Sequence, residues 1–234
     1  SISSDGNMLA VGSVGEDGIS AGINNGADND LLSNAGAVYV FTRSDSTWSQ
    51  QAYVKANVPI EGVGLGSSLS VSSDGNTLVV GAVNEYRSGA VYVFTRTSPT
   101  VVRPWVQQAY VKASNPFGSD HFGYSVSVSS DGNTLAVGAY SEDGSSAGIN
   151  GMDNYFMTNT GAVYIYIRSG TTWTQQAYVK ASNPTAHDLF GSSVSISSDG
   201  NTLAVGATSE DGNNAGINGL QNDLLINSGT VYIY

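Results

Sequence analysis

The chain has 234 residues, a formal net charge of −11 and only 12% charged residues. Its 40% hydrophobic content is enough to bury a core, which excludes a disordered acidic segment. The eight Lys and Arg residues are scattered singly, so neither nucleic acid nor an anionic membrane surface is an expected partner. The chain contains no cysteine, which excludes disulfides, thiolate metal sites and a cysteine nucleophile. No apolar run reaches the roughly 20 residues of a membrane span, and we expect no membrane insertion.

The most prominent motif is Ser-Ser-Asp-Gly-Asn, which stands between two strand-like runs in each of four repeats. Asp-Gly between such runs is a strong β-hairpin signal, since Gly adopts positive φ freely and Asp tolerates it. The motifs recur about every 60 residues, a period that suits a four-stranded propeller blade. No sustained 3.6-residue apolar period predicts a helix. The four hairpin aspartates are Asp5, Asp74, Asp131 and Asp199.

Four strand-like runs recur in a fixed order in the first three repeats, and the last repeat shows the first three of them. The first run alternates serine with apolar residues, as in residues 125–129, where Val126 and Val128 would face inward. The second run, as in residues 134–139, is rich in Ala and Gly, which would let neighbouring sheets approach closely. The third run reads Gly-Ala-Val-Tyr-Val-Phe in residues 36–41. The fourth run begins at a tryptophan in three repeats: Trp48, Trp105 and Trp173.

The fourth run of the first repeat illustrates the faces that regular alternation predicts. Alternation would place two sets on opposite faces: Trp48, Gln50, Ala52 and Val54 on one, and Gln51, Tyr53 and Lys55 on the other. The recurring tryptophan could be a sugar-stacking platform or could fill the gap between adjacent blades. Its strict recurrence favours the second interpretation.

The chain therefore divides into four repeats, with approximate bounds 1–56, 57–113, 114–181 and 182–234. The last repeat has only three runs, so residues 230–234 would form an unpaired apolar edge, which natural sheets rarely leave bare. Both ends of the chain fall inside strand patterns, and we expect it to be a portion of a longer protein. The predicted fold is all-β: one β-propeller domain or segment of four-stranded antiparallel blades, the last blade lacking its outer strand.

Two dipeptides that flank the hairpin, Phe122-Gly123 and Gly138-Ala139, resemble the FG-GAP repeat of integrin alpha-like β-propellers of bacterial type. The same order recurs as Phe190-Gly191 with Gly206-Ala207 and, more weakly, as Leu65-Gly66 with Gly81-Ala82. The first repeat has only Gly12-Ser13, and the proline of the family motif is absent from all four. The resemblance implies a seven-bladed full ring and an extracellular or cell-surface module for cell adhesion or protein binding.

Many repeats of this family bind calcium in the hairpin through a run such as Asp-x-Asp-x-Asp-Gly. Here each hairpin supplies one carboxylate, flanked by Ser and Asn, whereas calcium takes roughly six to eight oxygen ligands. We therefore predict that the hairpin aspartates form turns, and we expect neither a metal in the hairpins nor a cofactor.

Long loops join the second and third runs at residues 12–36, 138–161 and 206–229, and are called the long loops below; the second repeat has only a short connection, 81–89. Insertions at one point of every repeat gather on one face, which is often the binding face. Their acidic residues are the candidate ligand-binding set: Glu16, Asp17, Asp28, Asp30, Glu142, Asp143, Asp153, Glu210, Asp211 and Asp223. Calcium is a second ligand to consider for these loops. Alternatively, these residues only form turns and the Ile of each Ala-Gly-Ile-Asn segment packs beneath its loop, which is the interpretation we favour.

Catalytic motifs are absent from the sequence. The two histidines, His121 and His187, each follow or precede an aspartate, but neighbours in sequence do not define a catalytic dyad. No Gly-x-Ser-x-Gly elbow followed by suitable partners exists, and no phosphate-binding loop occurs. We predict no catalytic residue and no enzymatic activity.

The predicted function is a non-enzymatic interaction module that presents the long loops to a protein or glycan ligand. One alternative is a structural subunit that self-associates through the C-terminal edge strand into a fibre or surface assembly. The last-ranked alternative is a glycan-active hydrolase on a propeller scaffold, for which only the spatial separation of two carboxylates could decide.

Overall fold

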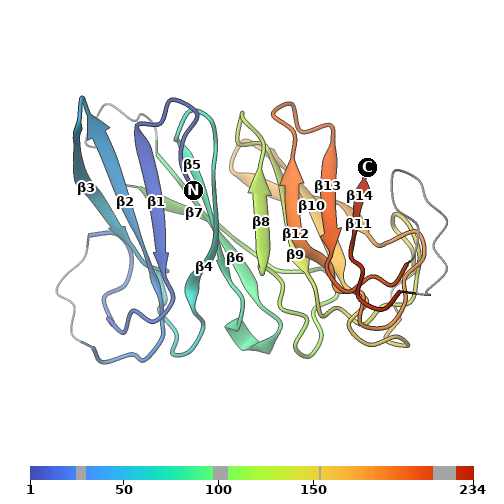
Figure 1. Ribbon diagram of the computed structural model, residues 1–234. Helices are drawn as coiled ribbons and strands as arrows, with labels where there is room; N and C mark the ends of the chain where they lie inside the picture. Colours follow the sequence, from blue (N-terminus) through green and yellow to red (C-terminus); the bar gives the residue numbers. More distant parts are fainter. Residues whose placement is uncertain (25–29, 97–104, 153, 213–224) are drawn as a thin grey trace.

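Figure 1 shows the computed structural model of the chain, a row of four antiparallel sheets, each of which we call a blade. The structure describes residues 1–24, 30–96, 105–152, 154–212 and 225–234. Blade 1 contains β1 (Met8–Ser13), β2 (Ala37–Ser44) and β3 (Thr47–Val54). Blade 2 contains β4 (Leu65–Val71), β5 (Thr77–Ala82), β6 (Ala90–Thr95) and β7 (Val106–Val111). Blade 3 contains β8 (Ser125–Val128), β9 (Thr134–Ala139), β10 (Ala162–Ser169) and β11 (Thr172–Val179). Blade 4 contains β12 (Phe190–Ile196), β13 (Leu203–Ala207) and β14 (Thr230–Ile233).

Within each blade the strands pair in chain order, which confirms the predicted all-β propeller blades. Blades 2 and 3 have the four expected strands, and blade 4 has three, with β14 at its edge. Blade 1 also has three strands, and an isolated bridge between Ile2 and Leu9 stands where its first strand would pair. In the described part of the chain the one helical element is a single 3-10 turn, η1 (Glu85–Arg87).

The hairpin between the first two strands of each repeat is held by its own side chains. In blade 3, Asp131 Oδ1 accepts hydrogen bonds from the Ser129 hydroxyl at 2.6 Å and from the Asn133 N–H at 2.9 Å. Its Oδ2 accepts a third from the Asn133 side-chain amide. These bonds, the Ser129 hydroxyl first, lower the pKa of Asp131. Gly132 follows with φ +71°, so the predicted turn role of this aspartate is confirmed.

The predicted alternation along the fourth strand is wrong, because a β-bulge interrupts this strand in blades 1, 2 and 3. On β10, the consecutive residues Ile165 and Tyr166 pair with Ala177 and Gln175, so Gln176 is the extra residue. One extra residue moves the rest of the strand to the opposite face. The tryptophan of β11 therefore packs toward blade 2, whereas Ala177 packs toward blade 4.

Trp105 and Trp173 fill gaps between blades, as favoured from the recurrence of this tryptophan. Trp105 is buried in the apolar cluster shared by blades 1 and 2, with the Arg96 guanidinium 4.8 Å from its ring centroid. Trp173 packs against the cluster between blades 2 and 3 and donates its indole N–H to Gln108 at 3.1 Å. Trp48 belongs to blade 1, which has no preceding blade among the described residues, and it is 40% exposed.

Close backbone contact between neighbouring blades explains the recurring glycines. A Cβ placed on Gly138 of β9 would lie 2.1 Å from the carbonyl oxygen of Gly191 in the next blade. The hydroxyl of Ser125 donates to this same oxygen at 2.7 Å. Beside Gly191, the side chain of Phe190 is fully buried, and its ring centroid lies 5.3 Å from that of Tyr232. The small residues of the second strand thus permit the close approach that the sequence predicts.

Candidate functional site: the long-loop face

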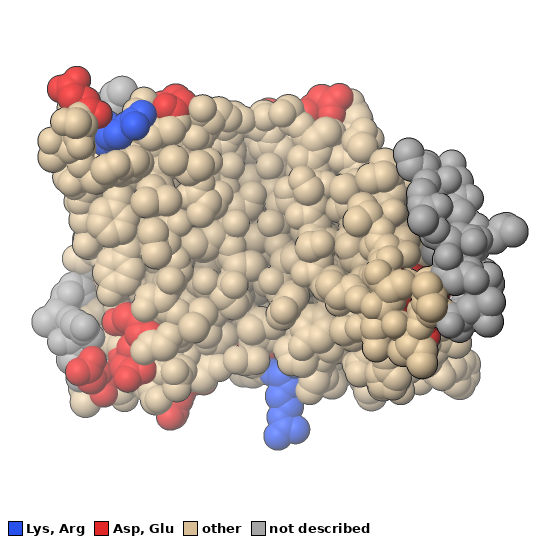
Figure 2. Space-filling view, in the orientation of Figure 1, with Lys and Arg blue, Asp and Glu red and all other residues tan. Residues whose placement is uncertain are grey.

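The described parts of the long loops leave the sheets at one end of the strands, and the Asp-Gly hairpins lie at the other end (Figure 1). In the face shown in Figure 2, the charged side chains gather at these two ends and the middle is uncharged. Ligand-binding chemistry that uses charge is therefore confined to one end or the other on this face.

The aspartate that follows each buried glutamate holds its long loop closed. Asp143 Oδ1 accepts the backbone N–H of Asn159 at 2.8 Å, and the Asp143 carbonyl accepts the N–H of Met157. Asp17 accepts the N–H of Asn34 in the same way, at 2.6 Å. These hydrogen bonds join residues that lie 17 and 16 positions apart within the loop.

The Ala-Gly-Ile-Asn segment of each described long loop adds to the edge of the fourth strand. Ile23 forms an antiparallel bridge with Val54, and Ile149 forms one with Val179. The Asn150 side chain accepts the backbone N–H of Tyr178 at 2.9 Å. Ile23 packs against the core as expected, but Ile149 is exposed, so the expectation that this isoleucine packs beneath its loop is wrong in blade 3.

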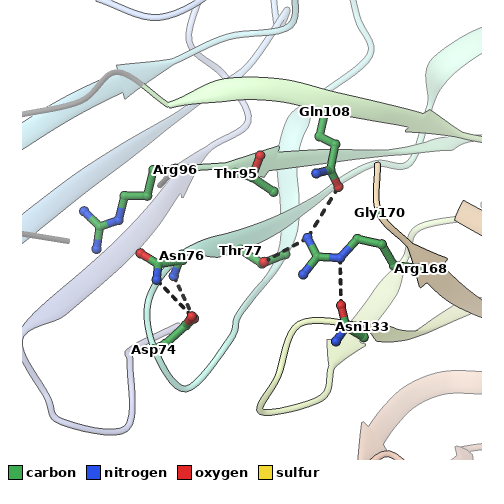
Figure 3. A pocket seen from close by; sticks show the side chains of 9 residues that line it. All are labelled: Asp74, Asn76, Thr77, Thr95, Arg96, Gln108, Asn133, Arg168 and Gly170. Atoms are coloured by element: carbon green, nitrogen blue, oxygen red, sulfur yellow. Dashed lines mark hydrogen bonds between the residues drawn. The ribbon is translucent and has the colours of Figure 1, made fainter. Parts of the chain in front are cut away.

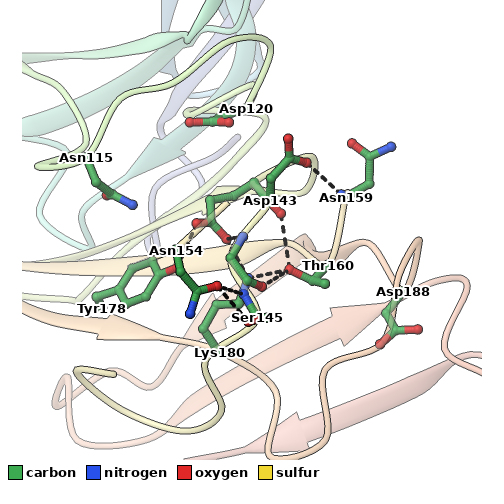
Figure 4. A network of polar contacts seen from close by, with 12 residues as sticks. Asn115, Asp120, Asp143, Ser145, Asn154, Asn159, Thr160, Tyr178, Lys180 and Asp188 are labelled. Carbon is green, nitrogen blue, oxygen red and sulfur yellow. Dashed lines mark hydrogen bonds and ion pairs between the residues drawn. The ribbon is translucent and has the colours of Figure 1, made fainter. Parts of the chain in front are cut away.

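Beneath these loops lies a buried ion pair that joins the loop to the fourth strand (Figure 4). In blade 3, the Lys180 ammonium contacts Glu142 Oε2 and the Thr160 hydroxyl. Tyr178 donates its hydroxyl to Glu142 Oε1 at 2.7 Å. Both charged side chains are nearly inaccessible to water, with 0% and 1% of their surface exposed. A buried pair of this kind is stable only because each charge has its partner.

Blade 1 repeats this arrangement. Lys55 pairs with Glu16, and the Tyr53 hydroxyl donates to the same carboxylate. Glu16 also accepts the backbone N–H of Gly18 at 3.1 Å, which begins the turn of the loop. The glutamate therefore ties the start of the long loop to the end of β3.

Blade 2 has the buried glutamate, a tyrosine and the lysine, but it lacks the long loop. Its glutamate, Glu85, lies in η1, is buried and accepts the Tyr92 hydroxyl at 2.7 Å. The Lys112 ammonium donates instead to Ser88 Oγ at 2.8 Å and to the Gly89 carbonyl at 2.6 Å. A lysine at the end of the fourth strand thus anchors the connection in all three blades that have this strand.

Blade 4 has the glutamate without the lysine. Glu210 is fully buried, and its Oε1 accepts the Asn183 side-chain amide at 2.7 Å. Among the described residues its Oε2 has no hydrogen-bond partner. Burial, followed by the nearby charge of Asp188, raises the pKa of Glu210 to about 7.

This raised pKa has a defined effect on stability. A carboxyl group that is harder to ionise in the folded protein destabilises the fold progressively as pH rises from the ordinary glutamate pKa, about 4.5, to the folded value, about 7. We expect Glu210→Gln to melt at a higher temperature than the wild type at pH 8, with little difference at pH 4.5. The measurement is thermal unfolding by circular dichroism across this range. The matched control is Glu61→Gln at an exposed position, and a Glu210→Gln curve parallel to the wild type would contradict the prediction.

The structure separates the candidate ligand-binding residues into four groups. Glu16, Glu142 and Glu210 are buried beneath the loops, and protein donors occupy the carboxylates of the first two. Asp17, Asp143 and Asp211 accept backbone N–H groups of their own loops, and Asp30 is exposed. Asp28, Asp153 and Asp223 lie outside the described residues. The ligand-binding role of this set stays a prediction.

The lysine anchors are the residues that sequence reasoning missed. Lys55, Lys112 and Lys180 recur at the same point of each repeat, directly after a strand that ends in valine. A regularly recurring lysine beside buried apolar residues signals a buried charge, which needs a carboxylate partner. The glutamate of the Glu-Asp-Gly segment near the start of each long loop was the carboxylate available to pair with such a lysine.

Large apolar side chains stand exposed on the long loops, at positions outside the predicted acidic set. Leu31 is 71% exposed, and Phe156, at the same position of the third repeat, is 87% exposed. Met152 of the same loop and Ile226 of the last loop are also exposed.

A cavity of about 390 Å³ opens at the hairpin end, between blades 2 and 3 (Figure 3). Its two arginines bind protein oxygens: Arg168 donates to Asn133 at 2.9 Å, and Arg96 donates to the Gly75 carbonyl at 2.8 Å. Arg168 also donates to the Thr77 hydroxyl of the neighbouring blade. These groups stabilise the hairpins and the blade contact.

The two histidines sit in turns with positive φ, 59° at His121 and 72° at His187. His121 stacks on Tyr140 with ring centroids 5.0 Å apart, and burial lowers the pKa of His121. In the part of the chain that the structure describes, no group of three or more His, Asp or Glu side chains could hold a metal ion. A search of the same residues for a helix able to cross a membrane found none.

The sequence of the chain matches a known repeat family. The FG-GAP repeat model matches residues 48–94, 105–166 and 173–234, which is more than half of the chain. No curated protein sequence matches significantly.

Solved structures similar to this chain include β-propellers. The β-propeller domain of Cps50 (Swd1) from Myceliophteria thermophila is 10% identical, with a TM-score of 0.49, over 88% of this chain and 48% of that one. A putative TolB from Agrobacterium tumefaciens is 12% identical, with a TM-score of 0.43, over 88% of this chain and 52% of that one. The present chain thus spans about half the length of these two proteins.

Proposed function

Because the chain belongs to the FG-GAP repeat family, and because its long loops share one end of the blades, we propose that it is a non-enzymatic interaction module. The module acts outside the cell or at the cell surface and binds a protein or glycan ligand through the long-loop face. The observation that carries the proposal is the exposure of Leu31 and Phe156 at equivalent positions of two loops that are otherwise firmly held.

The loops combine a fixed backbone with an exposed apolar side chain. Asp17 and Asp143 close the loops, and the buried pairs of Glu16 and Glu142 with lysine fasten them to the sheet. A surface whose backbone is already ordered loses less entropy on binding. Large apolar side chains on such a surface are typical anchors of an interface.

We expect the double variant Leu31→Ser, Phe156→Ser to bind an immobilised panel of extracellular proteins and glycans at least about fivefold more weakly than the wild type. Surface plasmon resonance against each panel member measures the change. The matched control is Val106→Ser, which removes an apolar side chain that is exposed on β7 rather than on a long loop. Equal loss in the control, or unchanged binding in the double variant, would contradict the proposal.

The exposed edge of blade 4 favours a second candidate, self-association through β14. Val231 and Ile233 are each 66% exposed on this strand. Their counterparts in blade 3, Val163 and Ile165, are buried against blade 4. Val231 and Ile233 thus belong to the face that the next blade covers in blade 3. The edge of β14, which pairs only with β13 in the described chain, is the template for pairing with another chain. Light scattering that gives the monomer mass at every concentration would exclude this candidate.

A further inference from the structure

The turn that leads into blade 3, residues 114–124, lies beside the short connection of blade 2. A long loop covers the equivalent turn at the other two blade boundaries. In blade 1, residues 33–34 of the loop accept two backbone N–H groups from residues 62–64 of the next turn. In blade 3, residues 158–159 accept the same two groups from residues 187–189. Neither bond has a counterpart among the described residues of the short connection, so the turn into blade 3 is left uncovered.

Five ring-bearing side chains gather on and beside this uncovered turn. Phe117 packs against Tyr155 of the long loop of blade 3, with ring centroids 4.4 Å apart. His121 stacks on Tyr140 at 5.0 Å, and Tyr140 in turn contacts Tyr124 at 4.4 Å. Phe117, Tyr124 and Tyr155 are 46–50% exposed, so their rings are open to a ligand. We call these five residues the aromatic platform.

The platform departs from the repeat. Three of its rings, those of Phe117, Tyr124 and Tyr140, occupy positions at which the neighbouring repeats have no aromatic residue. The equivalent residues are Ile60, Ser67 and Val83 in the second repeat and Thr185, Ser192 and Thr208 in the fourth. Blades 2 and 4 form without these rings, so packing of a blade does not require them. Their concentration beside the one short connection favours a role in binding.

The backbone beneath the platform is fixed. Asp120 is buried, and its Oδ2 accepts the N–H of Phe117 at 2.8 Å. The Asp120 carbonyl accepts the N–H of Ser141 at 3.3 Å, which ties the turn to the start of the long loop. The N–H of Tyr124 donates to the His121 carbonyl at 3.0 Å. The rings are therefore positioned before a ligand arrives, which lowers the entropy cost of binding.

The charge of the platform selects a neutral ligand. The chain carries a net charge of −11, which disfavours polyanions such as acidic polysaccharides and nucleic acids. Burial lowers the pKa of His121, so its ring is neutral at neutral pH. The other four side chains of the platform are phenylalanine and tyrosine. No charge on the platform itself would therefore pair with a charged ligand.

The packing of the rings narrows the class further. Centroid distances of 4.4–5.0 Å leave no gap between the rings within each group. The platform thus has neither a cage for an ammonium group nor grooves between rings for a proline-rich peptide. It offers outer ring faces with tyrosine hydroxyls at their edges. A pyranose sugar fits such a face, because its C–H groups meet the negative face of the ring and its hydroxyls can hydrogen-bond to tyrosine.

We propose that the aromatic platform is a binding site for a neutral glycan, whose pyranose rings stack on Phe117 and on the pair of Tyr124 and Tyr140. The proposal rests on the proposed interaction function, and it names the ligand class and the place on the long-loop face where that ligand binds. The short connection of blade 2 leaves room for the glycan where a long loop covers the turn in the other blades.

The probes are three neutral hexasaccharides, cellohexaose, mannohexaose and laminarihexaose, titrated into the full chain by isothermal titration calorimetry. We expect saturable binding of at least one of them. The variant Phe117→Thr, Tyr124→Ser, Tyr140→Thr introduces the residues of the fourth repeat and should bind that sugar at least about tenfold more weakly. Tyr124→Ser alone changes only one exposed ring and should weaken binding in the same direction. The matched control, Trp48→Ser, removes an exposed ring of β3 and should leave the affinity unchanged.

Three outcomes would overturn the proposal. The first is that none of the hexasaccharides binds at millimolar concentration. The second is equal affinity of the wild type and the triple variant, with both proteins giving the same melting curve. The third is binding of decaproline, but of no sugar, that the triple variant loses, which would assign the platform to a proline-rich peptide. A protein ligand that is lost in the Leu31→Ser, Phe156→Ser variant would still support the proposed function in each of these cases.

Discussion

Lys180→Met is expected to destabilise the protein by about 3–5 kcal/mol, because it leaves the Glu142 carboxylate charged, buried and without its cation. The loss should appear as a lower denaturant midpoint with an unchanged slope in urea unfolding followed by circular dichroism. Arg87→Met is the matched control, because this arginine is exposed; the expected change is within about 0.5 kcal/mol.

A double-mutant cycle separates the pair from its surroundings. Glu142→Gln alone should also be destabilising, because it leaves Lys180 buried without a carboxylate. The variant with both substitutions should lose less than the sum of the two single losses, by about 1 kcal/mol or more. Strict additivity would show that the two charges do not depend on each other.

Gly138→Ala should be destabilising by about 3 kcal/mol, because the new methyl group would lie 2.1 Å from the Gly191 carbonyl oxygen. The φ of Gly138 is not positive, so the effect measures contact between blades rather than backbone strain. Thermal and urea unfolding both report it. The methyl group would also lie 2.2 Å from the Ser125 hydroxyl, a side chain that can move, whereas the Gly191 carbonyl belongs to the backbone of blade 4.

Two other glycines serve as controls for this effect. The methyl group added by Gly15→Ala would meet only Asn34 Oδ1, at 3.6 Å. This substitution should therefore change the free energy of unfolding very little. Gly206 is the equivalent of Gly138 in blade 4, where the added methyl group meets the movable Ser193 hydroxyl at 2.4 Å and no backbone of another blade. Its alanine variant should lose clearly less stability than Gly138→Ala. Similar losses at the two positions would rule out the contact between blades as the cause.

The hairpins were predictable because their chemistry is local. Ser129, Asp131 and Asn133 form hydrogen bonds with one another within five residues. Every hydrogen-bond partner of the turn is therefore part of the sequence motif itself. The small residues around Gly138 likewise predicted that neighbouring sheets approach each other closely. The bulge at Gln176 was not predictable by alternation, since it depends on how two strands pair across the blade.

The long-loop glutamates show what sequence could not supply. Their position in polar, turn-rich segments favoured a role in turns and left ligand binding as the other interpretation, yet Glu142 is buried and bound to a lysine 38 residues away. Burial of a side chain depends on which strand returns beside it, and that pairing is set by the whole blade. The exposed apolar tip at Phe156 was missed for the same reason, because a phenylalanine in a loop is usually assigned to the core.

By itself, the sequence determined the number of repeats, the hairpin turns, the order of strands and the family of the repeat, because each depends on contacts a few residues apart or on recurrence along the chain. Only the tertiary structure decided the rest: which carboxylates are buried, which lysines neutralise them, and that Glu210 keeps one oxygen without a hydrogen-bond partner in the described chain. The physical reason is that the free energy of a charge depends on its desolvation and its partners. Both arise only when strands distant in sequence pack together.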